Sequence, residues 1–531
     1  MGIYLNPGNT DFYNAVNYSQ IYVDKTELIN YTNRVLFGEQ KCICVSRPRR
    51  FGKSMAANML TAYYSRECDS KELFGKLKIA QTELFRKHLN QYNVIRINML
   101  NFLNESNNVM EMIEFIEEDL IDELTNAYPN IKYPKRQNLI KIAATIFSSN
   151  NIPFVFIIDE WDCVLRDSKN NSEGQKKYLN FLCDLFKGQS YVALAYMTGI
   201  LPIKKYGIHS AINMFTEIAM TNPRELAEFT GFTESEVRTL CEEYNMSFDE
   251  TKRWYDGYNL KGLSIYNPRS VVMSMTGHDY DNYWTSTETY EALKIYIEMN
   301  FDGLKDKVTQ LIAGEKIQIN PAKFQNDMVT LRSTDDIFTL LVHLGYLTFD
   351  FYTNQVWIPN SEVAQEFINS IEDGGWEEVM NAIKNSDKLL EATLNGDEEK
   401  VAELIDKAHC DNTSILKYND ENSLSCVMSL AYYSARKSYT VERELPAGKG
   451  FADLVFRPRK NSSNSAMIVE LKYNKSAGGA LAQIKKKQYD GCLKDYFGEI
   501  LLVGINYDKD DKRHTCRIEK ITHTSHTEMY L

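Results

Sequence analysis

The 531-residue sequence predicts an α/β protein in which a doubly wound parallel sheet is followed by two further parts. Buried strands alternate with helices over residues 40–220, which is typical of such a sheet. The order helix, strand, strand, helix over residues 335–368 predicts a winged-helix-like unit within a helical middle region. Residues 421–508 show the order αβββαβ, which indicates a C-terminal unit with its own sheet. Because a chain of this length exceeds one hydrophobic core, we expect three domains, at residues 1–275, 276–405 and 406–531.

The composition is that of an ordinary globular protein, with 44% hydrophobic and 25% charged residues. The net charge of −12 argues against non-specific nucleic-acid binding by the whole chain, although a local basic cleft remains compatible with it. The ten cysteines are scattered without a CxxC pair, and the eight histidines form no cluster. This usage favours buried thiols in a reducing compartment over a disulfide framework or a zinc site.

The sequence predicts a cytoplasmic protein without a membrane partner. No apolar run approaches the roughly 20 residues that are needed to span a bilayer. The N-terminus lacks the basic and apolar regions of a signal peptide. The myristoylation pattern also fails, because Asn6 stands where serine or threonine is required.

The stretch from Cys42 to Met55 has the order strand, loop, helix that a phosphate-binding P-loop requires. An apolar run leads into a loop that ends in Gly52-Lys53-Ser54, and a helix-prone segment follows. Lys53 would reach the β- and γ-phosphates of a nucleotide, the Ser54 hydroxyl would bind Mg²⁺, and the first N–H groups of the helix would face phosphate oxygens. The residues expected to bind the nucleotide here are Arg49, Arg50, Phe51, Gly52, Lys53 and Ser54.

This loop departs from the general P-loop pattern at two positions. Arg47 stands where the loop usually begins with glycine, and Pro48 offers no N–H donor. Because both residues alter the backbone donors around the phosphates, the sequence leaves open whether the nucleotide is hydrolysed or only bound. For this stretch alone, an ordinary strand–turn–helix with a chance Gly-Lys-Ser is the alternative interpretation.

Residues 152–162 predict a strand that is buried on both faces and ends in Asp159-Glu160. This pattern is typical of a Walker B element. Asp159 would hold Mg²⁺ opposite Ser54, and Glu160 would polarise the attacking water. A hydrophobic strand ending in two acids is common by itself, but together with the upstream Gly-Lys-Ser it favours nucleotide binding.

Several residues near this expected site keep two interpretations. Residues 21–29 would either contact the nucleotide base or lead the chain into a helix. Thr198 ends a further buried strand, where it would sense the γ-phosphate or cap the turn. The sequence does not choose among three candidate fingers that would stabilise the charge of the transition state, which are Lys204, Lys205 and Arg224.

The middle of the sequence is helical and aromatic. Thr233 with Glu236 three residues later predicts a capping box at a helix start. The winged-helix-like unit lacks a cluster of lysine or arginine, so we interpret it as a packing module rather than a DNA reader.

Three charged residues interrupt the apolar strands of the C-terminal unit. Glu470 and Lys472 share one face of their strand, and a hairpin partner can set Asp453 beside Glu470. Charged groups in such strands are costly unless they have a function. Two carboxylates that hold Mg²⁺, with a lysine to orient a water or steady the phosphate, make a site for phosphodiester hydrolysis. Glu421 on the preceding helix could be a further ligand.

For Glu470-Leu-Lys472 alone, an exposed strand edge with a cross-strand ion pair is the alternative. The helix behind these strands would either contact backbone phosphates or present a solvated face. Its basic face consists of Gln483, Lys485, Lys486, Lys487 and Gln488.

Taken together, these motifs resemble two known families. Residues 47–54 resemble the signature of bacterial AAA-ATPase-like proteins, in which Arg-Pro replaces the first glycine of other P-loops. Four further stretches resemble other markers of that family, namely residues 22–26, Asp159-Glu160, residues 254–258 and residues 266–270. The C-terminal third resembles a PD-(D/E)XK nuclease domain, a restriction-endonuclease-like fold. Its two acids and its lysine are matched by Asp453, Glu470 and Lys472, whereas Ala452 departs from the motif's proline.

The resemblance implies a module that binds or hydrolyses ATP, joined to a Mg²⁺-dependent nuclease that acts on nucleic acid, with DNA expected. It implies catalytic roles for Glu160, Asp453, Glu470 and Lys472, and metal-ligand roles for Ser54, Asp159, Asp453 and Glu470. The alternative is a nucleotide-switched regulatory or binding protein whose nuclease fold binds without cleaving. The sequence leaves open whether the chain forms an oligomer and whether ATP licenses or restrains cleavage.

Overall fold

The structure is a computed structural model of the chain. It describes residues 2–167, 171–203, 212–284, 293–296, 303–324, 331, 333–412, 421–447, 450–459, 462, 464–493 and 496–523. The chain divides into two compact units, each made of two segments. The first unit comprises Met1–Thr289 and Gln318–Gln365, and the second comprises Tyr290–Ile317 and Glu366–Leu531. The three-domain division expected from the sequence stays a prediction.

A five-stranded sheet forms the centre of the first unit. Its strands are β1 Cys42–Ser46, β2 Asn93–Asn98, β3 Phe154–Asp159, β4 Val192–Gly199 and β5 Thr216–Ile218. They lie in the order β2-β3-β4-β1-β5, and all pairs are parallel. β1, β3 and β4 are buried at every residue, as expected for apolar strands covered on both faces. The predicted doubly wound parallel sheet is confirmed.

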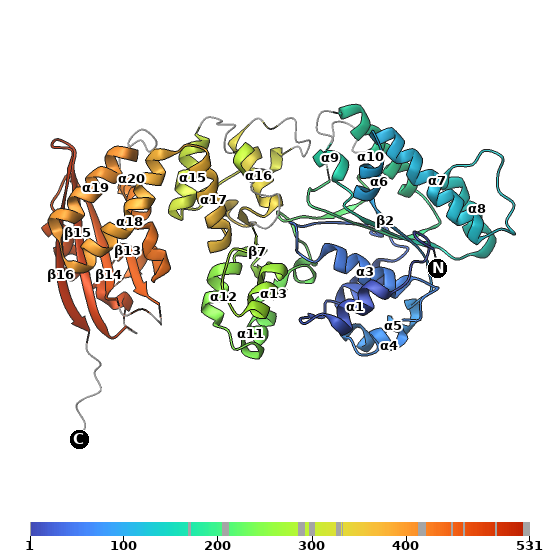
Figure 1. Ribbon diagram of the computed structural model, residues 1–531, viewed down its shortest axis with the longest axis horizontal. Coiled ribbons are helices and arrows are strands. Elements are labelled where there is room, and N and C mark those ends of the chain that lie inside the picture. Colours follow the sequence, from blue (N-terminus) through green and yellow to red (C-terminus); the bar gives the residue numbers. More distant parts are fainter. Residues whose placement is uncertain are drawn as a thin grey trace, which may run out of the picture. The chain divides into compact units, whose positions relative to one another are not determined.

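Helices cover both faces of this sheet (Figure 1). One face carries α6 Met99–Glu105, α7 Val109–Ala127, α8 Leu139–Asn150, α9 Cys163–Asp167 and α10 Ser172–Phe186. The other carries α1 Thr10–Tyr18, α3 Lys53–Tyr64, α4 Lys71–Phe74 and α5 Phe85–His88. α2 (Glu27–Val35) packs into the same core as α3. There, Ala57 and Leu60 of α3 join Ile43 and Val45 of β1 in one apolar cluster, which fixes the helix that follows the P-loop.

A smaller helical part follows the sheet in the first unit. It consists of α11 Glu234–Glu243, α12 Phe248–Tyr255, α13 Pro268–Gly277 and the strands β6 Phe232–Thr233, β7 Tyr258–Leu260 and β8 Leu263–Tyr266. The predicted capping box of Thr233 and Glu236 is confirmed at α11. Asn267 caps α13 by accepting from the N–H groups of Arg269 and Ser270, and Pro268 occupies the first helical turn.

The expected order helix, strand, strand, helix is present in the middle of the chain. Its elements are α16 Thr334–Leu344, β10 Thr348–Asp350, β11 Gln355–Trp357 and α17 Ser361–Asp373. β10 and β11 form an antiparallel hairpin, and β9 (Ile317–Gln318) extends the sheet beside β11. This part of the predicted fold is confirmed.

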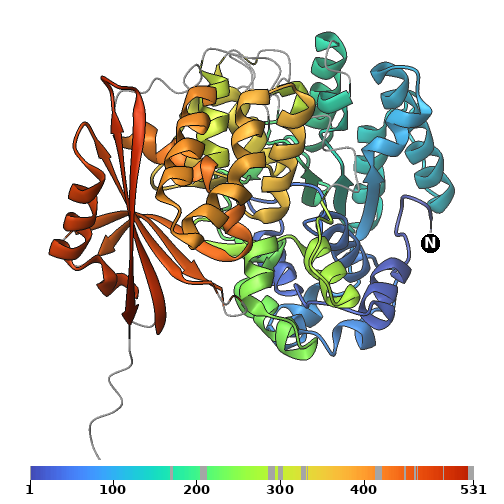
Figure 2. The same ribbon diagram turned by 60° about the vertical axis from the view of Figure 1, so that its left-hand side comes forward.

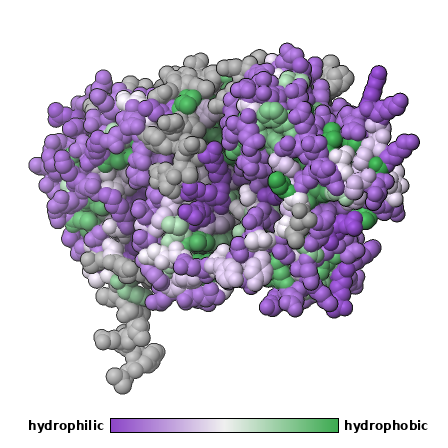
Figure 3. Space-filling view, turned by 45° about the vertical axis from the view of Figure 1, so that its right-hand side comes forward, coloured by the Kyte–Doolittle hydropathy of each residue, from purple (hydrophilic) through white to green (hydrophobic). Residues whose placement is uncertain are grey.

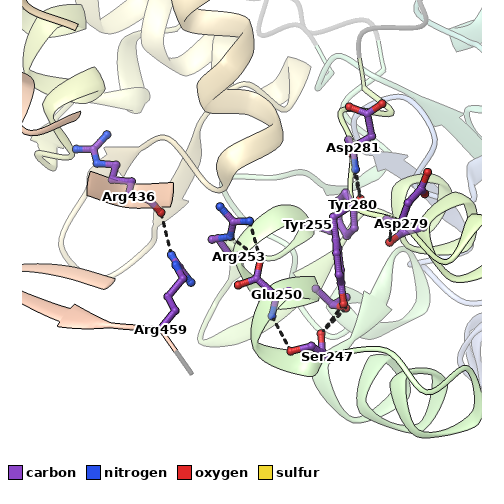
Figure 4. Close-up of polar contacts among 11 residues, drawn as sticks. Ser247, Glu250, Arg253, Tyr255, Asp279, Tyr280, Asp281, Arg436 and Arg459 are labelled. Atoms are coloured by element: carbon purple, nitrogen blue, oxygen red, sulfur yellow. Dashed lines mark hydrogen bonds and ion pairs between the residues drawn. The ribbon is translucent and has the colours of Figure 1, made fainter. Parts of the chain in front are cut away.

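The first segment of the second unit contains α15 (Leu304–Ala313), which is far in sequence from the rest of that unit. Arg436 donates from its two terminal nitrogens to the carbonyl oxygens of Ile312 at 2.8 Å and Ala313 at 2.7 Å. A cation at the last carbonyls of a helix satisfies acceptors that the helix leaves open. The backbone oxygen of Arg436 in turn accepts from Arg459 Nη2 at 3.3 Å (Figure 4). These bonds join α15 to the C-terminal sheet region.

A five-stranded mixed sheet forms the rest of the second unit, with helices on both faces (Figure 2). Its strands are β12 Tyr439–Ala447, β13 Gly450–Pro458, β14 Ala466–Tyr473, β15 Gly498–Asp508 and β16 Arg513–His523, in this order. Only the β14–β15 pair is parallel. The helices are α18 Glu377–Asn395, α19 Glu398–Asn412, α20 Glu421–Ala431 and α21 Ala477–Lys487. The predicted αβββαβ order is present, and β16 is an additional edge strand that the sequence analysis missed.

The surface agrees with the charged composition. Figure 3 shows a face on which hydrophilic residues predominate and hydrophobic residues form small separate patches. The cysteines that the structure describes are free thiols. Among the described residues, none of the helices has the length and apolar character needed to cross a bilayer.

Candidate functional site

The P-loop leaves β1 at Ser46 and enters α3 at Lys53. Two of its residues have left-handed backbones, Arg50 with φ +68° and Gly52 with φ +81°. A left-handed conformation is costly for a residue with a Cβ atom, and such conformations curl a backbone into the concave loops that bind anions. Gly52 forms the cap of α3, so the first N–H groups of this helix open toward the loop.

A cavity of about 670 Å³ lies over the P-loop, which is within the usual size of a nucleotide or small-molecule pocket. One part of its wall is apolar and aromatic, with Phe12, Ile21, Tyr22, Phe229 and Phe232. The other part is charged, with Arg49, Arg50, Lys53, Glu160, Arg166 and Arg269. The wall therefore offers an apolar surface for a base and cations for phosphates. Of the two interpretations of residues 21–29, entry into a helix is confirmed, because α2 begins at Glu27. Ile21 and Tyr22 also line the cavity, and contact with a base stays a prediction.

Lys53 is 5% exposed, and its Nζ donates to the carbonyl oxygen of Pro48 at 2.9 Å. Burial lowers the pKa of this lysine, and the nearby acids Glu160, Asp162 and Asp159 oppose that shift. The ammonium group thus has one neutral acceptor and several acids near it. A phosphate oxygen is a better acceptor than a carbonyl oxygen, because the hydrogen bond is then charge-assisted at both ends.

Asp159 ends β3 and is almost completely buried. Its carboxylate accepts from the Thr198 hydroxyl and, at 3.1 Å, from the backbone N–H of Glu160. Arg96 Nη2 lies 3.6 Å from its other oxygen. The hydroxyl of Thr198 is thus placed on Asp159, where it orients the carboxylate. That contact is neither of the two roles that the sequence suggested for Thr198.

Glu160 is held by an arginine that the sequence analysis did not identify. Arg166 Nη2 pairs with Glu160 Oε2, and Arg166 Nε lies 3.2 Å from Asp162 Oδ2. Asp162 accepts from the N–H groups of Ile200 and Leu201, so it also fixes the loop after β4. Burial raises the pKa of Glu160, while Lys53 and Arg166 oppose this. The only sequence signal for the contact between Asp162 and Arg166 is their spacing of four residues, which places them on one face of a helix.

Among the described residues, none of the candidate residues for stabilising transition-state charge lies at the cavity. Lys204 and Lys205 lie outside the residues that the structure describes. Arg224 is exposed, and its Nε donates to the carbonyl oxygen of Glu217 at 3.0 Å. Arg224 does not line the cavity.

The second cluster lies where β13 and β14 meet. Leu454 pairs with Val469, and continuing this antiparallel register by one residue places Asp453 opposite Glu470. Asp453 Oδ2 accepts from the Leu471 N–H at 2.6 Å, which ties its side chain to β14. Because opposite residues point to the same face, the predicted pairing of the two carboxylates agrees with this register.

Glu470 and Lys472 are both buried on β14, which excludes the exposed strand edge considered as their alternative. Lys472 Nζ donates to Glu470 Oε1 at 2.7 Å, and Gln483 Nε2 of α21 donates to the same oxygen. Sequence reasoning placed Gln483 only on a basic helix face, because its approach to Glu470 depends on how α21 packs. Lys485, on the same helix, pairs with Glu519 at the surface.

The donor set fits a divalent cation. Glu470 Oε2 is buried and, among the described residues, has no hydrogen-bond partner. Burial, and then the charge of Asp453, raises the pKa of Glu470 to about 7. In the part of the chain that the structure describes, no group of three or more His, Cys, Asp and Glu side chains could hold a metal ion. Two carboxylates suffice for Mg²⁺, which usually keeps several waters. The side chain of Glu421 lies outside the described residues.

This raised pKa predicts a pH-dependent metal affinity. The pKa of Glu470 in the folded protein, about 7, lies above the ordinary value of 4.5. The contribution of this group to the free energy of unfolding is therefore fully present below pH 4.5 and is lost as the pH rises through 7. A metal must displace that proton, so the affinity for Mn²⁺ should rise by up to about tenfold per pH unit below 7 and level off above it. Titration of Mn²⁺ by electron paramagnetic resonance from pH 5.5 to 8.5 measures this.

The matched control for this prediction is Asp453→Asn. Removing the charge of Asp453 lowers the pKa of Glu470, because that charge is, after burial, the second-largest cause of the raised pKa. The plateau in affinity should therefore move to lower pH in this variant, although one ligand is weakened. A Mn²⁺ affinity that does not change between pH 5.5 and 7 would contradict the assignment of Glu470.

Two family matches cover separate stretches of the chain. The family described as Predicted AAA-ATPase matches residues 7–209, and the PD-(D/E)XK nuclease superfamily matches residues 419–516. A protein described as uncharacterized in the vnfD 5′ region of Azotobacter chroococcum mcd 1 is 24% identical over 257 residues. That match covers 46% of this chain and 47% of the relative, so the chain spans less than half of the relative's length. Among solved structures, the Aeropyrum pernix ORC2 protein (ADPNP-ADP complexes) is 13% identical with a TM-score of 0.30, covering 67% of this chain and 97% of that one.

The two matched stretches contain the two clusters described above. Lys53 and Asp159 fall within the first match. Asp453, Glu470 and Lys472 fall within the second. The chain therefore combines an AAA-ATPase-like domain with a domain of the PD-(D/E)XK nuclease superfamily.

Proposed function

We propose that the protein binds ATP at its P-loop and that the nucleotide state controls a Mg²⁺-dependent nuclease site in the C-terminal domain, with DNA as the substrate. The observation that carries the proposal is the convergence of Asp453, Glu470 and Lys472 on neighbouring strands. The same chain holds its P-loop lysine in a cavity of nucleotide size, which supports the ATP part of the proposal.

At the nucleotide site, Lys53 Nζ would exchange the Pro48 carbonyl oxygen for phosphate oxygens. Ser54 and Asp159 would hold Mg²⁺, which when bound offsets the charge of the phosphates. Glu160 would orient a water once Arg166 no longer holds its carboxylate. Binding alone does not need this last step, so the pairing of Glu160 with Arg166 favours slow hydrolysis in the resting protein.

At the nuclease site, Asp453 and Glu470 would hold Mg²⁺, which when bound polarises the phosphodiester and lowers the pKa of a water. Lys472 Nζ lies beside Glu470 Oε1, where it can steady the negative charge that grows on the phosphate as water attacks. Gln483 keeps Glu470 in place through the same oxygen. A hydrogen bond to Tyr489, and to a smaller extent the charges of Glu470 and Asp453, raise the pKa of Lys487. This lysine near both acids can contact a neighbouring backbone phosphate.

The second candidate function is binding of nucleic acid without cleavage. The pKa of about 7 for Glu470 favours it, because a protonated carboxyl near neutral pH is a poor metal ligand. In this case the C-terminal domain would grip nucleic acid under the control of the nucleotide. The cytoplasmic location and the oligomeric state stay predictions.

A cleavage assay with purified full-length protein tests the proposal. Single-stranded DNA, duplex DNA and RNA are each incubated with Mg²⁺ or Mn²⁺, with and without ATP. We expect DNA cleavage that needs the divalent ion and changes in rate when ATP is added. Retention of DNA in a gel-shift assay without any cleavage would support the second candidate instead. Cleavage that persists in EDTA would contradict a metal-dependent site.

A further inference from the structure

Glu362 is a completely buried carboxylate at the start of α17. Ser270 Oγ donates to both of its carboxylate oxygens at 2.9 Å, and the Tyr283 N–H donates to Oε1 at 2.8 Å. The Asn282 side chain donates to the Glu362 backbone oxygen at 3.2 Å. Glutamate is almost never fully buried unless it is paired, because the ionised carboxylate loses its hydration. Glu362 therefore occupies a position that needs specific compensation.

This carboxylate is one step away from the nucleotide cavity by two routes. On the first route, Arg50 of the P-loop donates from Nη1 to the Tyr283 carbonyl oxygen at 2.9 Å. The backbone N–H of Tyr283 in turn donates to Glu362. On the second route, Ser270 follows Arg269 in α13. Arg50 and Arg269 both line the cavity.

The charges of these residues are coupled. Besides burial, the charge of Arg269 lowers the pKa of Arg50, which shows that the two guanidinium groups repel each other. The negative charge of Glu362 raises the pKa of Arg50, so it partly offsets the charge of that guanidinium group. The phosphates of a bound nucleotide would bring negative charge to the same part of the cavity. Two anions would then compete for the charge of Arg50.

The backbone that carries Tyr283 is held by other contacts (Figure 4). Tyr255 Oη donates to the Asp281 carbonyl oxygen at 3.1 Å and accepts from the Asp281 N–H at 3.2 Å. Tyr280 Oη donates to the Ser247 carbonyl oxygen at 2.9 Å. These bonds fix the backbone of this segment to α12 and its cap residue. When the contacts among Arg50, Tyr283 and Glu362 change, we therefore expect the side chains of Arg50 and Glu362 to move rather than this backbone.

We propose that Glu362 and the nucleotide phosphates are alternative counter-ions for Arg50, so that ATP binding weakens the contacts that hold Glu362, at the start of α17, to Ser270 and Tyr283. This inference rests on the proposed ATP-binding function and names how that site is regulated. The chain passes from the first unit to the second between Gln365 and Glu366, within α17. α17 is therefore the element through which the nucleotide state reaches the segment that continues to the nuclease domain. Glu362 is a positioning residue in this scheme.

The substitution Glu362→Gln tests the competition directly. Removing one of the two competing anions should tighten ATP binding by about fivefold or more, the usual lower range of coupling between sites. The affinity for adenosine, which has no phosphates, should stay unchanged. Isothermal titration calorimetry with the full chain measures both. A purely structural role for Glu362 would lower stability but would not raise the affinity for ATP alone.

The matched control is Glu366→Gln, one turn later in the same helix. Glu366 is also completely buried, and the contacts of Ser270 and Tyr283 are made with Glu362. Glu366→Gln should leave ATP affinity at the wild-type value. Equal or weaker ATP binding by Glu362→Gln, when the wild type binds ATP and Lys53→Ala does not, would overturn this inference and leave the proposed function standing. Failure of the wild type to bind ATP would overturn both.

Hydrogen exchange of α17 gives a second readout. Asn360 accepts from the Val363 N–H through its side chain at 3.0 Å and from the Ala364 N–H through its backbone at 3.0 Å. Saturating ATP should speed exchange at the first turn of α17 in the wild type. Ser270→Ala, which removes a donor but no charge, should speed this exchange without ATP and leave ATP affinity nearly unchanged. Exchange in the wild type that saturating ATP does not alter would overturn the proposal.

Discussion

Replacing Lys53 with alanine is expected to lower the affinity for ATP by about tenfold to a hundredfold. The ammonium group is buried in the cavity with one carbonyl oxygen as its acceptor, so it can be transferred to phosphate oxygens without losing hydration. Hydrogen bonds to charged groups contribute about 1.5–3 kcal/mol, and about 1.4 kcal/mol corresponds to a tenfold change in affinity. Isothermal titration calorimetry with ATP measures the loss.

The control for this loss is Lys177→Ala in the same unit. Lys177 is 47% exposed and pairs with Glu173 on the surface of α10, so its removal should not alter ATP affinity. Circular dichroism establishes that both variants remain folded. If Lys53→Ala keeps the wild-type affinity while folded, the P-loop assignment is wrong.

Replacing Asp453 with alanine should reduce DNA cleavage by more than about a hundredfold. The substitution removes one of two carboxylates at the proposed metal site, and a bound metal contributes several kcal/mol of charge stabilisation in the transition state. The fold should survive, because Asp453 is only half-buried, although its Oδ2 no longer accepts from the Leu471 N–H. The rate of cleavage of a labelled DNA under saturating Mn²⁺ measures the effect.

Asp511→Ala is the matched control in the same unit. Asp511 is exposed in the turn between β15 and β16, outside the two strands that carry Asp453, Glu470 and Lys472. This variant should cleave at the wild-type rate. Asp453→Asn, which keeps the size of the side chain, should be as inactive as the alanine variant. Cleavage by either Asp453 variant at the wild-type rate would show that the activity came from another protein.

The parts of the fold that sequence reasoning found are those with local chemical signals. The P-loop and the strand ending in Asp159 could be predicted, because each depends on residues within about a dozen positions. The capping box at Thr233 is equally local, since both partners lie in one turn. Asp453 and Glu470 are 17 positions apart, yet the short hairpin between β13 and β14 makes their pairing predictable from strand alternation.

The residues that sequence reasoning missed act through packing between distant elements. Gln483 reaches Glu470 only because α21 lies against β14, and Glu362 reaches Ser270 across 92 positions. Nothing in the local sequence distinguishes a glutamate that will be buried from one that will face water. The strand Arg513–His523 was missed because it mixes charged and apolar residues, which is typical of an edge strand but also of an irregular segment.

The interlaced segments of the two units have a consequence for how the chain emerges from the ribosome. α15 leaves the exit tunnel long before Arg436, whose side chain satisfies its last carbonyl oxygens. During translation this helix must wait for more than a hundred further residues before its partner exists. A stop codon placed just before α18 would therefore leave the last carbonyl oxygens of α15 without Arg436 as their donor. Expression of the AAA-ATPase-like region alone thus requires removal of residues 290–317 as well as the C-terminal segment.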